Sequence, residues 1–239
     1  LFDRPITAGA DVYVRQFVYP YQYSQESLGG TVMAGYPLSR NTRFFGAYGY
    51  EKTHVYDINP LYLSPEALAN LNLREALLLD RGGYRTVSKV VPSVVYNTVN
   101  QPMFPSDGER YSASVELAGP GGNTYYTKMR FEGIYYVPFT RRLSLGLRGE
   151  GQWISPRDRF GLPIFEKLFL GGEYTVRGFD MRSISPRDPQ TGIVTGGNKT
   201  VVFNAELYFQ IAGPVRVLAF YDAGQVRDIG ESFGWWQVT

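Results

Sequence analysis

The chain of 239 residues contains no cysteine and only one histidine, His54. The absence of cysteine excludes disulfide bonds and thiolate chemistry. A single histidine without cysteine argues against a zinc site, and no spacing places His54 beside a serine and an acid as a catalytic triad requires. We therefore expect His54 to be structural, and we predict a protein that is not an enzyme and uses neither metal nor cofactor.

Excess charge of one sign and long apolar runs are also missing. The 24 Lys and Arg residues nearly balance the 22 Asp and Glu residues, so we expect no nucleic-acid partner. No run approaches the roughly 18 apolar residues that a transmembrane helix needs. Aromatic residues make up 15% of the chain, and it contains 27 glycines. This composition favours many strands joined by turns, either in a soluble all-β protein or in a membrane β-barrel.

Hydrophobic and polar residues alternate with a period of two along much of the chain. Between residues 142 and 153, Leu143, Leu145 and Leu147 occupy odd positions, whereas Arg148 and Glu150 occupy even ones. Such alternation predicts strands with one apolar and one polar face. About nine strands are predicted in this way, at residues 10–18, 28–37, 43–55, 85–98, 111–117, 128–137, 142–153, 201–210 and 215–226.

The connections between these strands distinguish a barrel from a sandwich. Tight turns at residues 37–41, 138–142 and 211–214 alternate with long excursions at 52–84 and 154–199. Short turns at one end and long loops at the other are typical of outer-membrane barrels. Aromatic residues collect at strand ends, up to Trp235 and Trp236, as in interfacial girdles. We predict an all-β, transmembrane antiparallel β-barrel, with a soluble β-sandwich binding module as the alternative.

One passage, at residues 64–79, has a helical pattern. Ser64 suits the N-cap, Pro65 the first helical position, and Gly82 the stop after the helix. Because the passage falls within a long excursion, we expect one helix lying over the outer mouth of the barrel. We interpret it as a packing element without a function of its own.

The loop around Arg177 carries the most informative motif. Its sequence at residues 169–179 places one arginine among aromatic residues and the glycines Gly171, Gly172 and Gly178. Glycines permit the backbone to fold back tightly. An arginine inside a polar barrel lumen needs carboxylate partners. Side chains alternate between the two faces along a strand, and this alternation (the strand parity) places two carboxylates in the lumen, those of Glu206 and Asp222.

Val176-Arg177-Gly178-Phe179, preceded by Leu170-Gly171-Gly172, resembles the signature loop of the outer-membrane barrel assembly and translocation superfamily, which includes the BamA-like insertases. Three further segments resemble the family in order and spacing. These are the turn at residues 102–110, the segment at 196–207 and the strand at 220–224. The detailed resemblance covers residues 100–226, and the first hundred residues match only in the rhythm of strands and turns.

The resemblance implies a sixteen-stranded barrel in the bacterial outer membrane. Residues 1–239 would supply its middle portion, roughly the fifth to thirteenth strands, with the periplasmic POTRA repeats and the first and last strands absent. It also implies that Arg177 folds into the lumen and pairs with Glu206 and Asp222. Arg177, Gly178 and Phe179 would then anchor the signature loop, to which Val176 also belongs.

The family's function follows from the same resemblance. Its members fold and insert outer-membrane β-proteins without a cofactor, by templating strands at a lateral seam. The implied partners are unfolded outer-membrane proteins, accessory assembly lipoproteins and outer-membrane lipid. A secretion pore of the same superfamily and a passive porin-like channel are the alternative functions.

Overall fold

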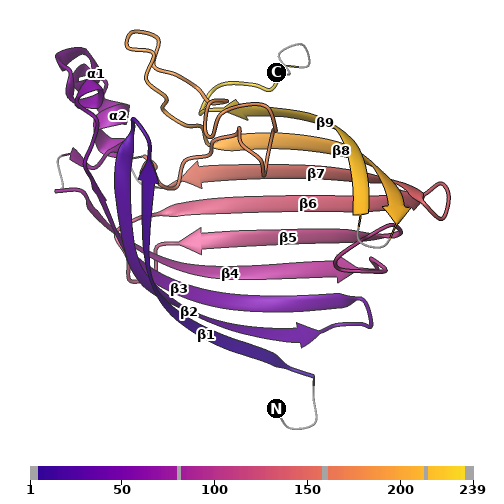
Figure 1. The fold of residues 1–239 in the computed structure, drawn as a ribbon. Coiled ribbons are helices and arrows are strands. Elements are labelled where there is room, and N and C mark those ends of the chain that lie inside the picture. The colour runs from indigo at the N-terminus through magenta and orange to yellow at the C-terminus, as the bar shows by residue number, and fades with distance from the viewer. Residues whose placement is uncertain (1–4, 80–81, 158–160, 213–214, 235–239) are drawn as a thin grey trace.

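The computed structural model describes residues 5–79, 82–157, 161–212 and 215–234. They form one antiparallel sheet in which nine strands follow each other in chain order (Figure 1). The strands are β1 (Thr7–Tyr19), β2 (Tyr23–Pro37), β3 (Thr42–Tyr56), β4 (Tyr84–Asn97), β5 (Gly108–Ala118), β6 (Tyr126–Pro138), β7 (Leu143–Pro156), β8 (Lys199–Ala212) and β9 (Val215–Arg227). Each strand predicted from the alternation is present. Trp235 and Trp236 lie outside the described residues.

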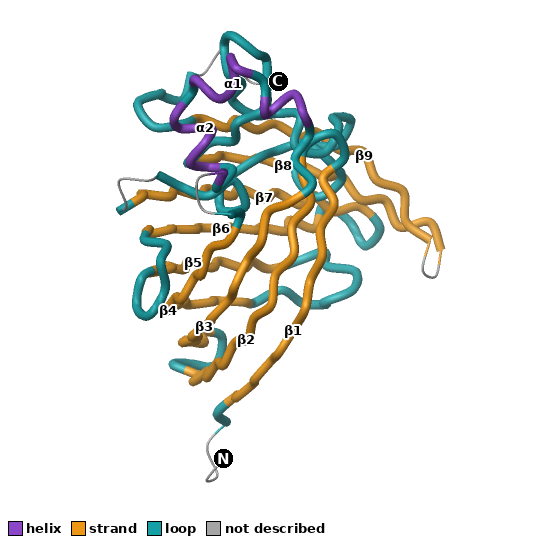
Figure 2. Tube along the Cα trace, turned by 90° about the vertical axis from the view of Figure 1, so that its left-hand side faces the viewer, coloured by secondary structure: helices purple, strands orange, loops and turns teal. Residues whose placement is uncertain are grey.

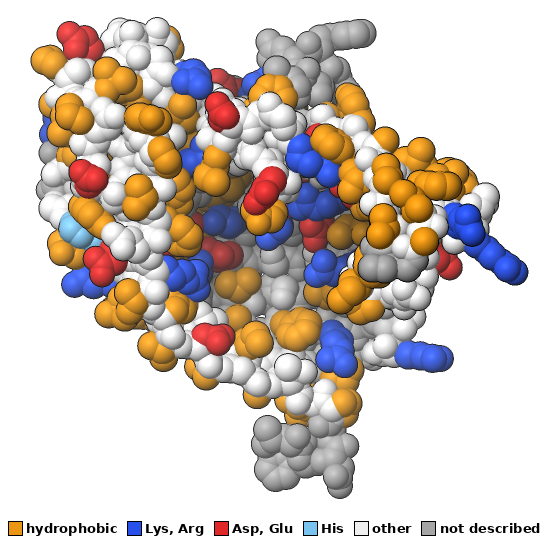
Figure 3. Space-filling view, viewed as in Figure 1, with side chains coloured by type: hydrophobic (Ala, Val, Ile, Leu, Met, Phe, Trp, Pro, Cys, Tyr) orange, Lys and Arg blue, Asp and Glu red, His pale blue; other side chains and the backbone are white. Residues whose placement is uncertain are grey.

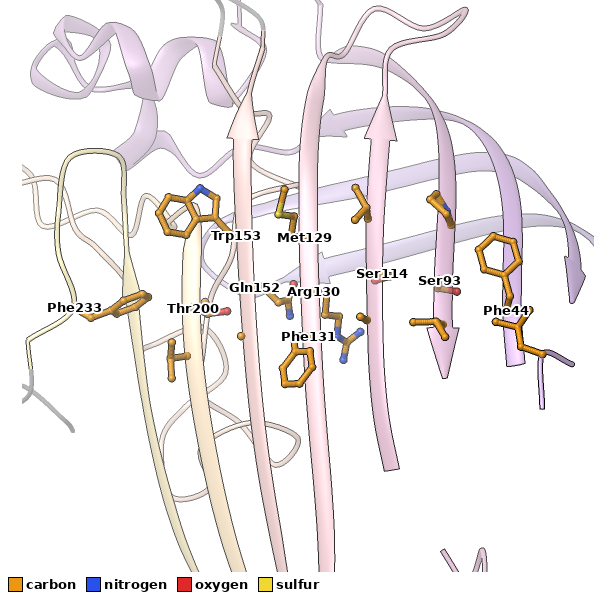
Figure 4. A pocket seen from close by; sticks show the side chains of 17 residues that line it. Phe44, Ser93, Ser114, Met129, Arg130, Phe131, Gln152, Trp153, Thr200 and Phe233 are labelled. Atoms are coloured by element: carbon orange, nitrogen blue, oxygen red, sulfur yellow. The ribbon is translucent and has the colours of Figure 1, made fainter. Parts of the chain in front are cut away.

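The alternation separates the two faces of the sheet. The sheet is curved (Figure 2), and on β7 the even-numbered Ser144 and Glu150 are buried on the concave face. The convex face carries large exposed apolar side chains instead, among them Trp153, Met129 and Phe131, which lie close together in Figure 4. In a soluble protein such a face would be covered by a second layer. The described chain contains no second sheet, so the apolar face is directed outward as in a membrane barrel.

The two edges of the sheet are β1 and β9, which do not pair with one another in the part of the chain that the structure describes. The nine strands therefore form a curved wall. Closure of this wall into a barrel is not seen among them.

The connections are asymmetric, as the sequence predicts. The β2–β3 and β6–β7 turns, at residues 38–41 and 139–142, lie at one end of the strands, which we call the short-turn edge. The β4–β5 connection at 98–107 lies at the same end. The long connections at 57–83 and 157–198 both lie at the opposite end, the long-loop edge.

The helical passage differs from the prediction. Instead of one helix over 64–79, the structure has a 3₁₀ helix, η1 (Pro60–Leu63), and two short helices, α1 (Pro65–Ala69) and α2 (Leu71–Ala76). The single-helix prediction is wrong because Asn70 has extended backbone angles, φ −80° and ψ 99°, and its side chain accepts a hydrogen bond from the Leu73 amide. Asn70 thus ends α1 and caps α2. Ser64 is the N-cap of α1, as predicted.

These helices cover the long-loop edge and take part in the largest buried apolar cluster. The cluster joins them to the ends of β2 and β3 and to the long β7–β8 connection. Its buried members are Tyr23, Val55, Tyr62, Ala67, Leu73, Ala76, Leu77, Leu78, Ile164 and Ile193. None of the helices in the described residues is long and apolar enough to cross a membrane.

Candidate functional site

The candidate site lies where the connection between β7 and β8, called here the β7–β8 loop (residues 157–198), turns back over the concave face (Figures 1 and 2). The loop is held by three isolated bridges, Leu168 with Gly197, Leu170 with Ile184 and Arg187 with Val194. It is therefore a shaped element with its own backbone pairing, and the Arg177 segment forms a reversal inside it.

Three glycines shape this reversal. Gly171, Gly172 and Gly178 have φ angles of 104°, 98° and 86°, a region that favours glycine. The Gly172 amide donates to the Phe179 carbonyl at 2.9 Å, and the Gly171 amide donates to the Thr175 hydroxyl at 3.0 Å. At Gly171 a Cβ would lie 2.2 Å from the Asp180 carbonyl oxygen, so no other residue fits there.

Arg177 extends from this reversal to the two strands next to the loop. Its Nε and Nη2 atoms donate to the two carboxylate oxygens of Asp222 on β9, both at 2.7 Å. Its backbone amide also donates to Asp222 Oδ2, at 3.0 Å. Nη1 lies 2.6 Å from Glu206 Oε1 on β8. The guanidinium stacks on the Phe220 ring, 3.8 Å from its centre.

The two carboxylates differ in burial. The side chain of Asp222 is 2% exposed, whereas those of Glu206 and Arg177 are 24% and 23% exposed. Hydrogen bonds to Asp222, and secondarily the Glu206 carboxylate, raise the pKa of Arg177 above its usual value. The guanidinium is therefore charged at every physiological pH. We call Asp222, the nearly buried carboxylate, the inner anchor of Arg177, and Glu206, the partly exposed carboxylate, its outer anchor.

The remaining predicted residues have separate roles. Val176 is buried beside Gly224 of β9, whereas the Phe179 ring is partly exposed and the residue contributes its carbonyl to the reversal. Gly178 has open space around the position of a Cβ. Its φ angle, and not close packing, accounts for glycine there.

Sequence reasoning missed Asn204, which lies at the centre of the site. Its Nδ2 atom donates to Asp222 Oδ1 at 2.8 Å and to the Thr175 carbonyl at 2.9 Å, while its Oδ1 accepts from Arg148 Nη1 at 3.1 Å. Asn204 has the same strand parity as Glu206, two residues away. That parity could have identified it as a third residue of the loop anchor.

Arg148 connects the site to a belt of ion pairs across the concave face, where Figure 3 shows cationic and anionic side chains together in the hollow. Arg148 Nε donates to Glu132 Oε1 at 2.8 Å, and the same guanidinium pairs with Glu150. Lys89 and Lys128 continue the belt, pairing with Glu116 at 3.1 Å and Glu166 at 2.6 Å. Paired charges of this kind are expected in a polar barrel interior.

A second arginine of the loop, Arg182, was also missed. It is buried, has a left-handed φ of 63°, and its guanidinium carbon lies 3.5 Å from the Phe169 ring centre and 4.1 Å from that of Tyr19. Nη1 donates to the Tyr23 hydroxyl at 3.1 Å. The β7–β8 loop is therefore fastened at both sides of the sheet, by Arg177 to β8 and β9 and by Arg182 to β1 and β2.

Gly224 provides a test of how closely the loop packs on the wall. A Cβ at this position would lie 2.8 Å from Leu170 Cδ1 and 3.0 Å from Val176 Cγ2. We expect Gly224→Ala to lower the free energy of unfolding of the full-length protein by about 1 to 2 kcal/mol, because the loop must lift from β9. Chemical denaturation in detergent micelles measures the effect. Gly149→Ala is the matched control, since nothing lies within 4 Å of a Cβ there, and an equal loss in both variants would contradict close packing.

The described residues contain no group of three or more His, Cys, Asp or Glu side chains that could hold a metal ion. The single histidine, His54, stacks on Tyr84 with ring centres 4.1 Å apart. The contacts of Arg177 with Asp222 and Glu206 fasten the β7–β8 loop to β8 and β9.

Comparison with known proteins identifies the family. A model of the Omp85 superfamily domain matches residues 1–238, nearly the whole chain. The chain belongs to the Omp85 superfamily. The fold and the family together make it an outer-membrane protein and not an enzyme, and they exclude the soluble β-sandwich alternative.

Several relatives of this Omp85 chain are outer membrane protein assembly factors named BamA. That of Nitratidesulfovibrio vulgaris is 23% identical over 238 residues, covering 98% of this chain and 28% of the relative. The BamA of Neorickettsia risticii is 25% identical over 236 residues, covering 96% of this chain and 30% of the relative. The chain thus spans less than a third of these relatives.

Two solved structures show the same fold. A crystal structure of BamA from Haemophilus ducreyi lacking POTRA domains 1–3 has a TM-score of 0.76 and 18% identity, over 93% of this chain and 47% of that one. CdiB from Acinetobacter baumannii has a TM-score of 0.58 and 16% identity, over 95% of this chain and 38% of that one. The curved wall of nine strands therefore matches part of the fold of both solved structures.

Proposed function

We propose that the protein is an outer-membrane protein assembly factor, which folds and inserts other β-barrel proteins into the outer membrane. The observation that carries the proposal is the Arg177 anchor, in which a loop of an Omp85 chain is tied to the barrel wall by Asp222 and Glu206. The assembly factors named among its relatives support the same function. Its substrates would be unfolded outer-membrane proteins, with accessory assembly lipoproteins as partners.

In this proposal the nine strands are the middle portion of a sixteen-stranded barrel, and the exposed apolar side chains of the convex face contact lipid. Insertion takes place at the seam between the first and last strands of that barrel. An edge strand there presents unpaired backbone groups, which template an incoming strand by β-augmentation.

The anchored loop would keep the curvature of the nine-stranded sheet fixed while the seam between the first and last strands of the barrel opens. It crosses the concave face and is fastened near both edges of the sheet, through Arg177 and Arg182. A wall held in one curvature confines movement to the weakly paired seam. The anchoring residues would thus support insertion without contacting the substrate.

Two other functions compete with this one. A secretion pore of the same superfamily would also carry the anchored loop, and the similarity to CdiB is compatible with it. The number of periplasmic repeats distinguishes the two, since several favour an assembly factor and two favour a dedicated exporter. A passive porin-like channel would conduct ions steadily and would not need a fixed loop arginine.

The test is Arg177→Ala in the full-length protein, in bacteria depleted of their native copy. We expect the amount of folded outer-membrane proteins to fall severalfold while the abundance of the variant itself falls much less. The loss is expected because the loop loses the guanidinium contacts with both carboxylates and keeps only the backbone hydrogen bond to Asp222. Quantitative immunoblotting of unheated membrane fractions measures both amounts.

Arg187→Ala is the matched control for this experiment. Arg187 lies on the same loop but is exposed, and its guanidinium donates to the Gly192 carbonyl at 3.1 Å. Normal outer-membrane biogenesis in the Arg177→Ala strain would overturn the proposal. Equal defects in both strains would mean that any loss of loop charge impairs the protein.

A further inference from the structure

A cavity of about 400 Å³ opens on the concave side at the short-turn edge. It lies between the β4–β5 connection, the β6–β7 turn and the adjoining ends of β8 and β9. Its lining includes three arginines, Arg141, Arg142 and Arg216, together with Ser106, Thr140 and Tyr208. The Tyr208 hydroxyl donates to Glu206. None of the cavity's lining residues is an aspartate or glutamate. The volume falls within the range of roughly 300–1,000 Å³ typical of ligand sites.

The charges in this cavity are arranged differently from those farther up the concave face. There, cations have carboxylate partners, as in the pairs of Arg130 with Glu150 at 3.1 Å and of Lys89 with Glu116 at 3.1 Å. Arg141 and Arg142 are exposed, and no described carboxylate lies within ion-pair distance of either. Among the described residues, arginines without a carboxylate partner therefore gather at the short-turn edge of the concave face.

The third arginine, Arg216, is held in position by neutral groups. Its guanidinium donates to the Pro105 carbonyl at 3.4 Å and stacks 4.6 Å from the centre of the Tyr208 ring. The carboxylates of Asp107, at the end of the β4–β5 connection, and of Glu109, near the start of β5, do not line the cavity. Glu109 accepts instead from the Tyr111 hydroxyl at 2.9 Å. Arg216 thus has an aromatic and a carbonyl neighbour but no described anion.

Strand parity shows from which side a ligand enters. Tyr208 and Arg216 share the concave face with Asn204 and Asp222, and Ser144 lies opposite Tyr208 in the register of β7 and β8. The alternate residues Phe209 and Val217 are exposed on the convex, apolar face. A ligand therefore enters from the aqueous interior or from the short-turn side, and not from the bilayer.

We propose that this cavity binds the carboxylate groups of an acidic polypeptide segment that approaches from the short-turn side. Guanidinium groups bind carboxylates in a bidentate manner, and the hydroxyls of Ser106 and Thr140 supply further hydrogen bonds. The Tyr208 ring and the Phe104 side chain give apolar contacts to an extended chain. The inference does not rest on the proposed function, since the chemistry is the same whichever polypeptide carries the segment.

The test uses the full-length protein in nanodiscs of zwitterionic lipid and a fluorescent eight-residue peptide of alternating Asp and Glu. We expect saturable binding by fluorescence anisotropy, weakened by salt, and no binding of the corresponding Asn and Gln peptide. Arg141→Gln with Arg142→Gln is expected to weaken binding at least tenfold. Both substitutions lie in an exposed turn, and the mobility of the unheated protein in gels verifies folding.

Arg40→Gln is the matched control, because Arg40 is exposed in the β2–β3 turn at the same edge but does not line the cavity. Its effect is expected to stay below twofold. Equal weakening by Arg40→Gln, or equal binding of the neutral peptide, would overturn the proposal. Binding of anionic phospholipid vesicles that the double variant loses, without peptide binding, would assign the cavity to lipid headgroups and also overturn it.

Discussion

Replacement of Asp222 by asparagine is expected to lower the free energy of unfolding of the full-length protein by about 2 to 3 kcal/mol. The nearly buried Asp222 carboxylate accepts from Arg177 Nε, from Nη2 and from the Arg177 backbone amide. Asparagine has one acceptor oxygen and no charge, so the guanidinium loses its bidentate partner. Denaturation by guanidinium chloride in detergent micelles measures the change.

The control for this prediction is Glu206→Gln. The Glu206 side chain is 24% exposed and contacts a single guanidinium nitrogen within the Arg177 pair, so solvent screens the interaction and we expect a loss of about 1 kcal/mol or less. Arg177→Lys is expected to behave like Arg177→Ala, because one ammonium group cannot reproduce the planar contact with Asp222. Equal costs for Asp222→Asn and Glu206→Gln would contradict the assignment of Asp222 as the inner anchor.

The strands could be predicted from the sequence because alternation is a local property. Leu143, Leu145 and Leu147 indicate the outward face of β7 without knowledge of any other strand. The asymmetry of short turns and long loops was readable for the same reason. The break at Asn70 was not recognised, although asparagine is a good N-cap and its position between two helical segments is a local signal.

Local sequence patterns predict only part of the site. Parity placed Glu206 and Asp222 on the concave face, and a resemblance supplied the expectation that Arg177 meets them. Gly224 could not be identified in this way, because its role depends on how closely Leu170 and Val176 approach β9. That approach is set by the path of a loop of more than thirty residues, which no periodicity describes.

The role of Arg182 could not be predicted from local sequence patterns at all. Its partner Tyr23 is 159 residues away along the chain, and nothing in the surrounding sequence indicates a buried arginine. Within the described residues its Nε and Nη2 atoms have no hydrogen-bond partner. The desolvated cation is held chiefly by the rings of Phe169, Tyr19 and Tyr23, an interaction of about 2 kcal/mol when water is excluded.

We therefore expect the loss of unfolding free energy in Arg182 variants to depend on the volume and the backbone preference of the new residue, and not on its charge. Arg182→Ala is expected to lose about 3 kcal/mol of unfolding free energy, because it leaves a cavity among the aromatic rings. Arg182→Gly is expected to be about 1 kcal/mol less harmful than alanine, since the φ of 63° strains any residue with a Cβ. Denaturant unfolding of the full-length variants gives the order.

Arg182→Met is the decisive variant in this series. Methionine fills most of the same space and contacts aromatic rings favourably, while removing a buried charge that has no carboxylate partner in the described chain. We expect its stability to lie within about 1 kcal/mol of that of the wild type, because the lost cation–π attraction is offset by the desolvation penalty that is no longer incurred. If methionine were as harmful as alanine, the positive charge itself would be required. An anionic group from another part of the full-length protein would then have to reach Arg182, and the second fastening of the loop would be an ion pair instead of an aromatic cage.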